Sequence, residues 1–444
     1  MLPTVTNSKS FEVTMKELWK MGASALAKLS KAGDVSCVEI INAHLERIDQ
    51  INSDVNAITL ILKDVALKIA KRYDDDPNKY SDLPLLGVPF TVKENIDFLK
   101  TPTTNGVPYL AHSMPSRNDP IVNRMIEAGA IPIGRTNLPE MGMRLDTDNP
   151  LRGRTFNPWN KALTPGGSSG GDGVAIATGM TPFGLGNDIG GSLRNPAYCN
   201  GICAIKPSAG IIPWAPSIEP IDMGIPRIFL SNGPMTRSIE DLEIGLSILA
   251  GRDLNDPDSI DSPKAQMKPA NPKAAFITSI DDNISFPSAT SKAIEKATQT
   301  LRAEGWMIEE VVPPELERVH QVWQSILRPL IQSLPREIFK KETADYLDRF
   351  ESSSNYLSLE EALIERQRLR RLWSDFFSVY HVCIGPTWCN LPWPIDSDLD
   401  PENGNEVLRK SFAFIAPGNC LGIPSVSMPM GIANNLPTGI QIYS

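Results

Sequence analysis

The chain has 444 residues, of which 41% are hydrophobic and 21% are charged, and these values are ordinary for a folded globular protein. Its formal net charge of −9 argues against a surface for nucleic acid or anionic membrane, which would need clustered lysine and arginine. Six cysteines are too few for a disulfide framework and lack the paired spacing of a metal site, so we expect a reduced, cytoplasmic setting and no metal.

The amino-terminal segment, 1–70, is predicted to be helical. Polar and acidic residues stand where a signal peptide would have its apolar core, and nowhere do about 18 apolar residues follow one another, so we expect neither export nor a membrane segment. Ser36 and Glu39 form a capping box, and apolar residues then recur at helical spacing. A helix is therefore predicted over 37–50.

Strand and helix patterns alternate over 80–250. The run GVPFTV predicts a buried strand with Lys93 at or just past its carboxyl end, where open α/β sheets place their sites. Asp119 and Pro120 then begin a helix that Gly129 ends. This alternation predicts an α/β sheet covered by helices.

The second half of the chain, 274–444, follows a polar, proline-rich stretch at 251–273. We interpret this stretch as a surface connection within one unit, and a domain boundary is the alternative. A strand is predicted to restart the fold at 274–280 and a helix to follow at 288–306. Residues 320–382 are predicted to be mostly helical.

Three short motifs carry the evidence for function: Lys93 in VKENID, Ser168 in PGGSSGG and Ser192 in DIGGSLRNPA. Their separations, 75 residues (168 − 93) and 24 residues (192 − 168), resemble the amidase signature family of Ser-Ser-Lys hydrolases. Similar stretches extend over much of the chain, and only about 253–415 is individual to this protein. The resemblance implies a single large domain, 1–444, with a central mixed, mostly parallel β-sheet covered by helices on both faces.

The resemblance also implies the roles of the residues around Ser192, which would be the nucleophile. Ser168, in a cis peptide with Gly167, would pass the proton of Ser192 to Lys93, and Ser169 would support this arrangement by hydrogen bonding. Gly190 and Gly191 let the backbone turn several N–H groups into one concavity. The implied oxyanion hole consists of the N–H groups of Ile189, Gly190, Gly191 and Ser192.

Lys93 must be neutral to act as a base, so burial or nearby positive charge has to lower its pKa from about 10.4. Its apolar approach in the sequence fits burial. Asp188 and Arg194 flank Ser192 and are expected to pair and brace the loop. None of the four histidines lies in a catalytic context, which argues against a Ser-His-Asp triad.

The chain departs from the family pattern at Asp172 and Gly173, where small apolar residues are more frequent. It also ends at Ser444, whereas the family usually continues for some tens of residues with a final helix. We therefore expect that the natural protein is longer or that this helix is absent.

The expected reaction is hydrolysis of a small-molecule carboxamide to acid and ammonia through an acyl-serine. The alternative is the glutaminase subunit of a glutamyl-tRNA amidotransferase, and a third, non-enzymatic interpretation is a scaffold that retains the fold. We expect no cofactor, and a homodimer stays open. Arylacetamides or aryl acylamides would suit the aromatic residues of 320–393, which line either the pocket or the core. Gly142, Leu145 and Trp388 are the candidate pocket residues.

Overall fold

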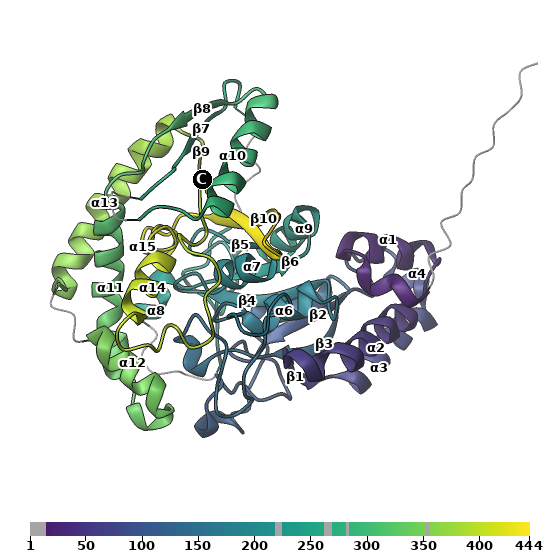
Figure 1. Ribbon diagram of the computed structural model, residues 1–444. Coiled ribbons are helices and arrows are strands. Elements are labelled where there is room, and N and C mark those ends of the chain that lie inside the picture. Colours follow the sequence, from purple (N-terminus) through teal and green to yellow (C-terminus); the bar gives the residue numbers. More distant parts are fainter. Residues whose placement is uncertain (1–14, 218–223, 262–268, 281–283, 352–354) are drawn as a thin grey trace, which may run out of the picture.

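One continuous β-sheet organises the chain (Figure 1). The computed structural model describes residues 15–217, 224–261, 269–280, 284–351 and 355–444. The sheet has 11 strands in the order β1-β3-β2-β4-β6-β5-β10-β11-β9-β7-β8. The strands are β1 (Ile58–Ile61), β2 (Pro89–Lys93), β3 (Ile131–Thr136), β4 (Phe183–Asp188), β5 (Cys203–Lys206), β6 (Ser231–Thr236), β7 (Lys273–Phe276), β8 (Met307–Glu310), β9 (Val382–Gly385), β10 (Ser425–Ala433) and β11 (Leu436–Tyr443).

The sheet is mixed, as predicted, but the expectation that it is mostly parallel is wrong. Among the described strands, the pairs β2–β3, β2–β4, β7–β8 and β7–β9 are parallel, and the other six pairs are antiparallel. The antiparallel centre comes from β6, which lies between β4 and β5, and from the β10–β11 hairpin. The hairpin turns at Asn434 and Asn435, whose φ angles of 51° and 61° suit a tight type I′ turn.

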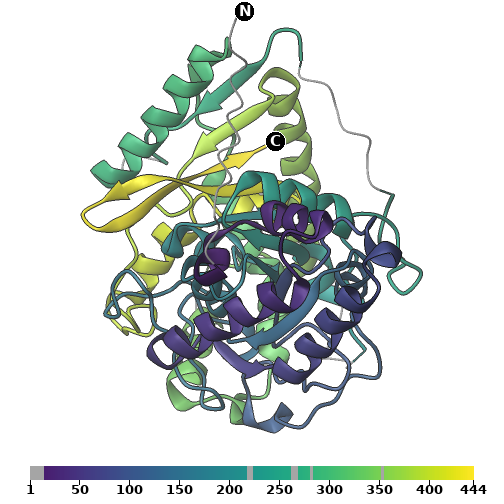
Figure 2. The ribbon, with the colours of Figure 1, turned by 90° about the vertical axis from the view of Figure 1, so that its right-hand side faces the viewer.

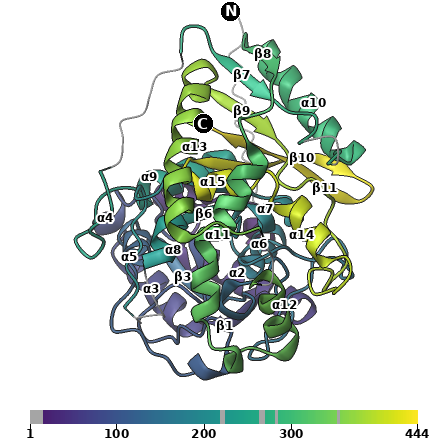
Figure 3. The ribbon, with the colours of Figure 1, turned by 90° about the vertical axis from the view of Figure 1, so that its left-hand side faces the viewer.

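Helices cover both faces of the sheet, as predicted. Gly184 of β4 lies against Ile176 of α6, whereas the preceding residue, Phe183, contacts Gly245 of α9. Adjacent strand residues point to opposite faces, so α6 and α9 lie on opposite sides of β4. In Figure 2 the purple amino-terminal helices lie toward the viewer, and in Figure 3, from the other side, α11 and α13 do.

The longer helices are α1 (Ala23–Ala32), α2 (Cys37–Val55), α3 (Lys63–Asp75), α5 (Pro120–Glu127), α6 (Gly170–Ala177), α7 (Arg194–Asn200), α9 (Ile239–Leu249), α10 (Ser288–Ala303), α11 (Leu316–Ser333), α12 (Lys341–Glu351), α13 (Leu359–Val379) and α14 (Gly404–Phe412). The shorter ones are α4 (Pro77–Tyr80), α8 (Gly224–Phe229), α15 (Ala416–Cys420) and the 3₁₀ turns η1 (Met15–Lys20), η2 (Pro108–Leu110), η3 (Glu140–Gly142) and η4 (Arg336–Ile338). No described helix is long and apolar enough to cross a bilayer.

Several local predictions are confirmed. The capping box of Ser36 begins α2, which runs on to Val55 and is longer than predicted. Asp119 caps α5 through the N–H of Ile121. The strand predicted at 274–280 ends earlier, at Phe276. Part of the polar connection, 262–268, lies outside the described residues.

The two halves of the chain share this sheet. β5 pairs with β10, and β11 pairs with β9, so a strand from the first half is joined directly to strands from the second. This continuity fits one domain better than two.

Candidate active site

The three predicted site residues come from one edge of the sheet. Lys93 is the last residue of β2, Ser192 follows β4, and these strands are parallel neighbours. Carboxyl ends of parallel strands meet at the same edge. Ser168 lies in the loop that leads into α6. Strand direction therefore explains how residues about a hundred positions apart are brought together.

Lys93 is buried, and its Nζ donates hydrogen bonds to Ser168 Oγ at 2.7 Å and to Asn187 Oδ1 at 3.0 Å. Burial lowers the pKa of Lys93 to about 7, although the carboxylates of Asp172 and Asp188 oppose the shift. A neutral lysine has two N–H groups and one lone pair. With one N–H on Asn187, the lone pair can accept the proton of Ser168.

Ser168 follows Gly167 through a cis peptide bond, as predicted. A side chain at Gly167 would come within 2.5 Å of the Arg144 carbonyl oxygen, so only glycine fits there. The backbone N–H of Ser169 donates to the Ser192 carbonyl at 3.1 Å, although the Ser169 hydroxyl has no partner among the described residues. The two loops are thus joined through the backbone.

The hydroxyl groups of Ser168 and Ser192 line the same cavity, but within the described chain no hydrogen bond joins them. A proton relay along these residues needs two successive hydrogen bonds, and only the bond between Lys93 and Ser168 is formed. The hydroxyl of a serine turns about a single torsion, so its position can change without movement of the backbone. Catalytic hydrogen bonds are often long before substrate binds.

The loop after β4 presents free backbone donors. In the described part of the chain, the N–H groups of Ile189, Gly190 and Ser192 have no hydrogen-bond acceptor. The N–H of Gly191 instead donates to Asp188 Oδ1 at 2.7 Å. The expectation that Gly191 belongs to the oxyanion hole is therefore wrong for this structure, because its donor already braces the loop. Three unpaired donors remain in the described loop.

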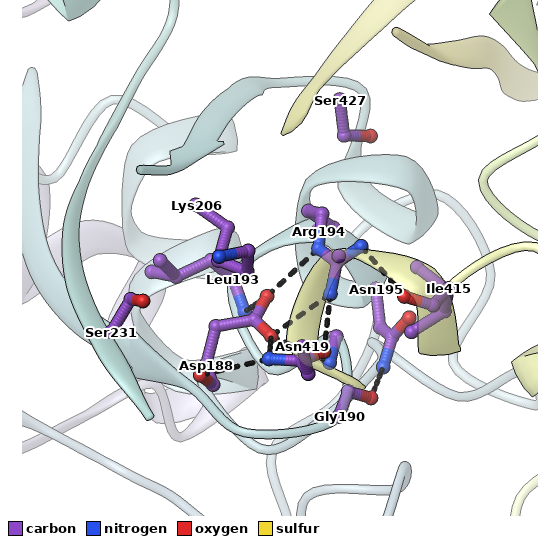
Figure 4. Close-up of polar contacts among 12 residues, drawn as sticks. Asp188, Gly190, Leu193, Arg194, Asn195, Lys206, Ser231, Ile415, Asn419 and Ser427 are labelled. Atoms are coloured by element: carbon purple, nitrogen blue, oxygen red, sulfur yellow. Dashed lines mark hydrogen bonds and ion pairs between the residues drawn. The ribbon is translucent and has the colours of Figure 1, made fainter. Parts of the chain in front are cut away.

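A buried ion pair holds this loop in place (Figure 4). Arg194 donates from Nε to Asp188 Oδ2 and from Nη2 to Asp188 Oδ1, each at 3.0 Å. Asn419 donates to Asp188 Oδ1 at 2.9 Å, and Arg194 donates to Gln441 at 2.8 Å. Burial alone would raise the pKa of Asp188, but Arg194 holds it well below its usual range. The predicted pairing is confirmed.

Two cavities reach Ser192. The larger has a volume of about 260 Å³ and the smaller about 60 Å³, and Gly142, Met143, Ile189 and Leu330 border both. Aromatic walls line each of them, with Tyr109 and Trp214 in the larger and Trp323, Tyr346, Phe350 and Phe412 in the smaller.

Of the predicted pocket residues, Gly142 and Leu145 line these cavities, and Trp388 does not. Trp388 is buried in the core, where its ring stacks on Trp393 with centroids 5.6 Å apart. Its Nε1–H donates to Asn195 Oδ1 at 2.7 Å. The prediction for Trp388 is therefore wrong, because its polar atom is used inside the fold.

Asn187 was not anticipated, and neither was the contact that Trp323 makes with the loop at Ser192. Asn187 binds Lys93, and it exchanges a pair of hydrogen bonds with Asn95 at 3.1 and 3.2 Å. Asn187 lies one residue before Asp188 on a strand beside β2, and this position in the sequence could have indicated that its side chain lies near Lys93. Trp323 donates to the carbonyl of Ile189, and no sequence signal indicates that contact.

Three carboxylates outside this site, those of Asp146, Asp396 and Asp398, lie within 4.8 Å of one another. Such a set has the chemistry of a cation site. Here, however, Arg144 donates to Asp398 and Asp396, and Arg154 donates to Asp146 and Asp396. The two guanidinium groups offset most of the charge of the three carboxylates, and this network fixes the loop containing Leu145.

The chain is similar in sequence and in fold to several known proteins. The sequence pattern of the Amidase family matches residues 39–444. The indoleacetamide hydrolase of Bradyrhizobium diazoefficiens is 34% identical over 440 residues, which cover 96% of this chain and 83% of that protein. A glutamyl-tRNA(Gln) amidotransferase component of Natranaerobius thermophilus is 27% identical, covering 92% and 89%. A bacterial aryl acylamidase structure superposes with a TM-score of 0.81 at 23% identity, covering 96% and 92%.

Proposed function

The chain belongs to the amidase signature family and is a small-molecule amide hydrolase, and on that premise we propose that Ser192, Ser168 and Lys93 are its catalytic triad. The observation that carries this proposal is the hydrogen bond between Lys93 and Ser168. Lys93 is buried and its pKa is lowered to about 7, and the unpaired N–H groups of the Ser192 loop lie beside it. A nucleophile, a base and an oxyanion hole are what amide cleavage requires.

In the proposed reaction, Ser192 Oγ attacks the amide carbonyl carbon. Its proton passes to Ser168 Oγ while the proton of Ser168 passes to Lys93 Nζ. The negative charge that forms on the carbonyl oxygen is held by the N–H groups of Ile189, Gly190 and Ser192. Lys93 then returns its proton through Ser168 to the leaving nitrogen, the C–N bond breaks, and water cleaves the acyl-serine by the same route.

We propose an arylacetamide-like substrate whose ring occupies the larger cavity. A cavity of about 150 Å³ is enough for a benzene ring. The larger cavity, at about 260 Å³, therefore has room for a bicyclic ring, whereas the smaller, at about 60 Å³, has room for a short alkyl group only. The similar Bradyrhizobium enzyme is named for an indole amide, which supports this choice.

The alternative is the glutaminase subunit of a glutamyl-tRNA amidotransferase, to which the chain is also similar. The two proposals differ in their dependence on a partner. Ammonia release from an arylacetamide by the purified chain supports the first. Glutamine hydrolysis that appears only when partner proteins are added would replace it with the second.

The nucleophile is tested with Ser192→Ala. Turnover should fall by several orders of magnitude with little change in thermal stability, because one hydroxyl is lost from a cavity wall. Ser247→Ala, at an exposed position on α9, is the matched control and should keep full activity. Mass spectrometry should place a fluorophosphonate adduct on Ser192 in the wild-type protein. An adduct on Ser168, or retained turnover in Ser192→Ala, would refute the assignment.

The same proposal predicts the pH dependence of catalysis. Because burial lowers the pKa of Lys93 to about 7, the free base becomes populated as pH rises through neutrality. kcat/KM should climb with pH around 7 and then level off.

We also propose a reduced cytoplasmic setting, supported by six buried cysteines without a disulfide between them. A homodimer stays a prediction that sedimentation of the purified chain would test.

A further inference from the structure

A buried carboxylate that the triad does not include lies behind the site. Asp172 is in the first turn of α6, four residues after Ser168, and its side chain is inaccessible to solvent. Its Oδ1 accepts a hydrogen bond from Thr91 at 3.1 Å, and its Oδ2 has no partner among the described residues. Burying a half-satisfied carboxylate is costly, and a purely structural role would favour full hydrogen bonding.

Three strands place Asp172 on the same side of the sheet as Lys93. Thr91, which binds Asp172, is two residues before Lys93 on β2, so the two side chains share one face. Thr136 of β3 pairs with Lys93 of β2, and its hydroxyl lies close enough to Asp172 to lower the pKa of that carboxyl. A side chain at Gly184 of β4 would meet Asp172 Oδ1 at 2.9 Å.

Asp172 differs from the other carboxylates near Lys93 because no cationic side chain of the described chain forms an ion pair with it. Asp188 is paired with Arg194, and Glu94 is paired with Arg152 at 2.9 Å. Glu94 also accepts hydrogen bonds from Thr59 and Thr104.

A guanidinium beneath the site, that of Arg135, donates to backbone carbonyls of Val92, Lys93 and Ile96 and to Thr101. Burial raises the pKa of Asp172 to about 7, and Thr136 and Lys93 oppose this. Charge on Asp172 and charge on Lys93 therefore favour each other.

We propose that Asp172 is a positioning residue that supplies the counter-charge for the protonated form of Lys93, an inference that rests on the proposed role of Lys93 as the base. When Lys93 takes the proton of Ser192 through Ser168, an ammonium forms in a buried site. With a carboxylate at Asp172, the Lys93–Asp172 pair passes from a charge of −1 to neutral while the substrate oxygen passes from neutral to −1. The step then moves charge without leaving the ammonium uncompensated.

The test is the pH dependence of Ser192 labelling by a fluorophosphonate, a probe that needs no knowledge of the natural substrate. Asp172→Asn keeps the shape and the acceptor for Thr91 but removes the charge. The rate of labelling should rise with pH as Lys93 loses its proton, and we call this rise the acidic limb of the pH profile. Loss of a nearby carboxylate lowers the pKa of an ammonium, so the acidic limb should move to lower pH by about one unit. The plateau rate should fall roughly tenfold, because the base is weaker.

Two further variants keep the result interpretable. Asp241→Asn alters another buried carboxylate, which accepts from the N–H groups of Ala23 and Ser24 at the start of α1, and should lower stability while leaving the pH profile unchanged. Thr91→Val keeps the Asp172 charge but removes its hydrogen bond, which raises the pKa of Asp172. Thr91→Val should move the acidic limb in the same direction by a smaller amount. It replaces Asp172→Asn in the test if that variant does not fold.

The outcomes separate this inference from the proposed function. A wild-type protein that does not label at Ser192 contradicts the triad. A second outcome is that the wild-type protein labels normally while a folded Asp172→Asn or Thr91→Val variant keeps the acidic limb of the wild-type protein. That result would overturn the role of Asp172 alone. A shift of the limb with an unshifted Asp241→Asn control supports it.

Discussion

The indole Nε1–H of Trp323 donates a hydrogen bond to the backbone carbonyl of Ile189 at 3.1 Å. Trp323 belongs to α11 and forms a wall of the smaller cavity, and Ile189 carries one of the free N–H groups beside Ser192. This wall of the smaller cavity is thus attached directly to the loop that would hold the oxyanion. Changes in the wall should be felt in the rate of the chemical step.

Trp323→Phe keeps an aromatic wall but removes this hydrogen bond. We expect kcat to fall about tenfold with little change in KM, because misplaced oxyanion donors lose transition-state stabilisation. Steady-state kinetics on one arylacetamide measures both constants. Trp373→Phe, which removes the hydrogen bond to Pro314 within the core, is the matched control and should leave kcat unchanged. A raised KM at constant kcat would show that Trp323 only contacts substrate.

Gly142→Ala should impair catalysis beyond its cost in backbone strain. Gly142 has φ of +70°, and an added Cβ would lie 3.2 Å from Ser168 Oγ. The strain alone should cost about 1–2 kcal/mol of unfolding free energy. Gly33→Ala is the control, because Gly33 has φ of +73° and nothing within 4 Å. Both variants should lose similar stability in urea titrations, but only Gly142→Ala should lose kcat/KM. Equal activities would argue against crowding of Ser168.

Asp188→Asn should destabilise the protein by about 3–5 kcal/mol, because Arg194 is left as a buried charge with a weaker partner. The folded-state pKa of Asp188 lies below its unfolded value. This carboxyl therefore contributes stability that is present above about pH 4 and is lost as pH falls toward the folded pKa. In urea denaturation between about pH 3 and 7, the free energy of unfolding should fall less steeply with decreasing pH in the variant than in the wild-type protein. If the free energy of unfolding had the same slope against pH in both proteins, the Asp188–Arg194 pair would make no contribution to the pH dependence of stability.

Lys93→Met should stabilise the folded protein at neutral pH while abolishing turnover. The pKa of Lys93 is about 7 in the folded state and about 10.4 in the unfolded chain. The unfolded state binds more protons between these values, so wild-type stability should rise with pH across that window. The variant should lose this rise, whereas Lys28→Met, at an exposed lysine, should keep it. A destabilised Lys93→Met would show that the ammonium is well compensated in the fold.

The assignment of Lys93, Ser168 and Ser192 came from the family resemblance of their three motifs, and local signals predicted only the elements that carry them. The apolar run before Lys93 predicts a buried strand, and the glycines around Ser168 and Ser192 predict tight loops. Asn187, Asp172 and Trp323 were not assigned because their partners are 81 to 134 residues away along the chain. Only the sheet brings those residues together.

Two errors have physical causes of the same kind. Trp388 and Trp323 are both tryptophans of the variable half, and residue type cannot tell a ring stacked on Trp393 from a ring that faces a cavity. The proportion of parallel strands was misjudged because alternating strands and helices do not specify which neighbour each strand chooses. β6 returns beside β4 in the opposite direction, and no local pattern requires this.

The position of β11 bears on when during synthesis the enzyme becomes competent. β10 and β11 fill the gap between β5 and β9, and Gln441 and Tyr443 of β11 accept hydrogen bonds from Arg194. The contacts that β11 adds to Arg194 therefore form only once the chain has been synthesised as far as Tyr443. Such pairing over 247 residues is slow to form, so a nascent chain that has not yet reached β11 carries Lys93, Ser168 and Ser192 but lacks these contacts to Arg194.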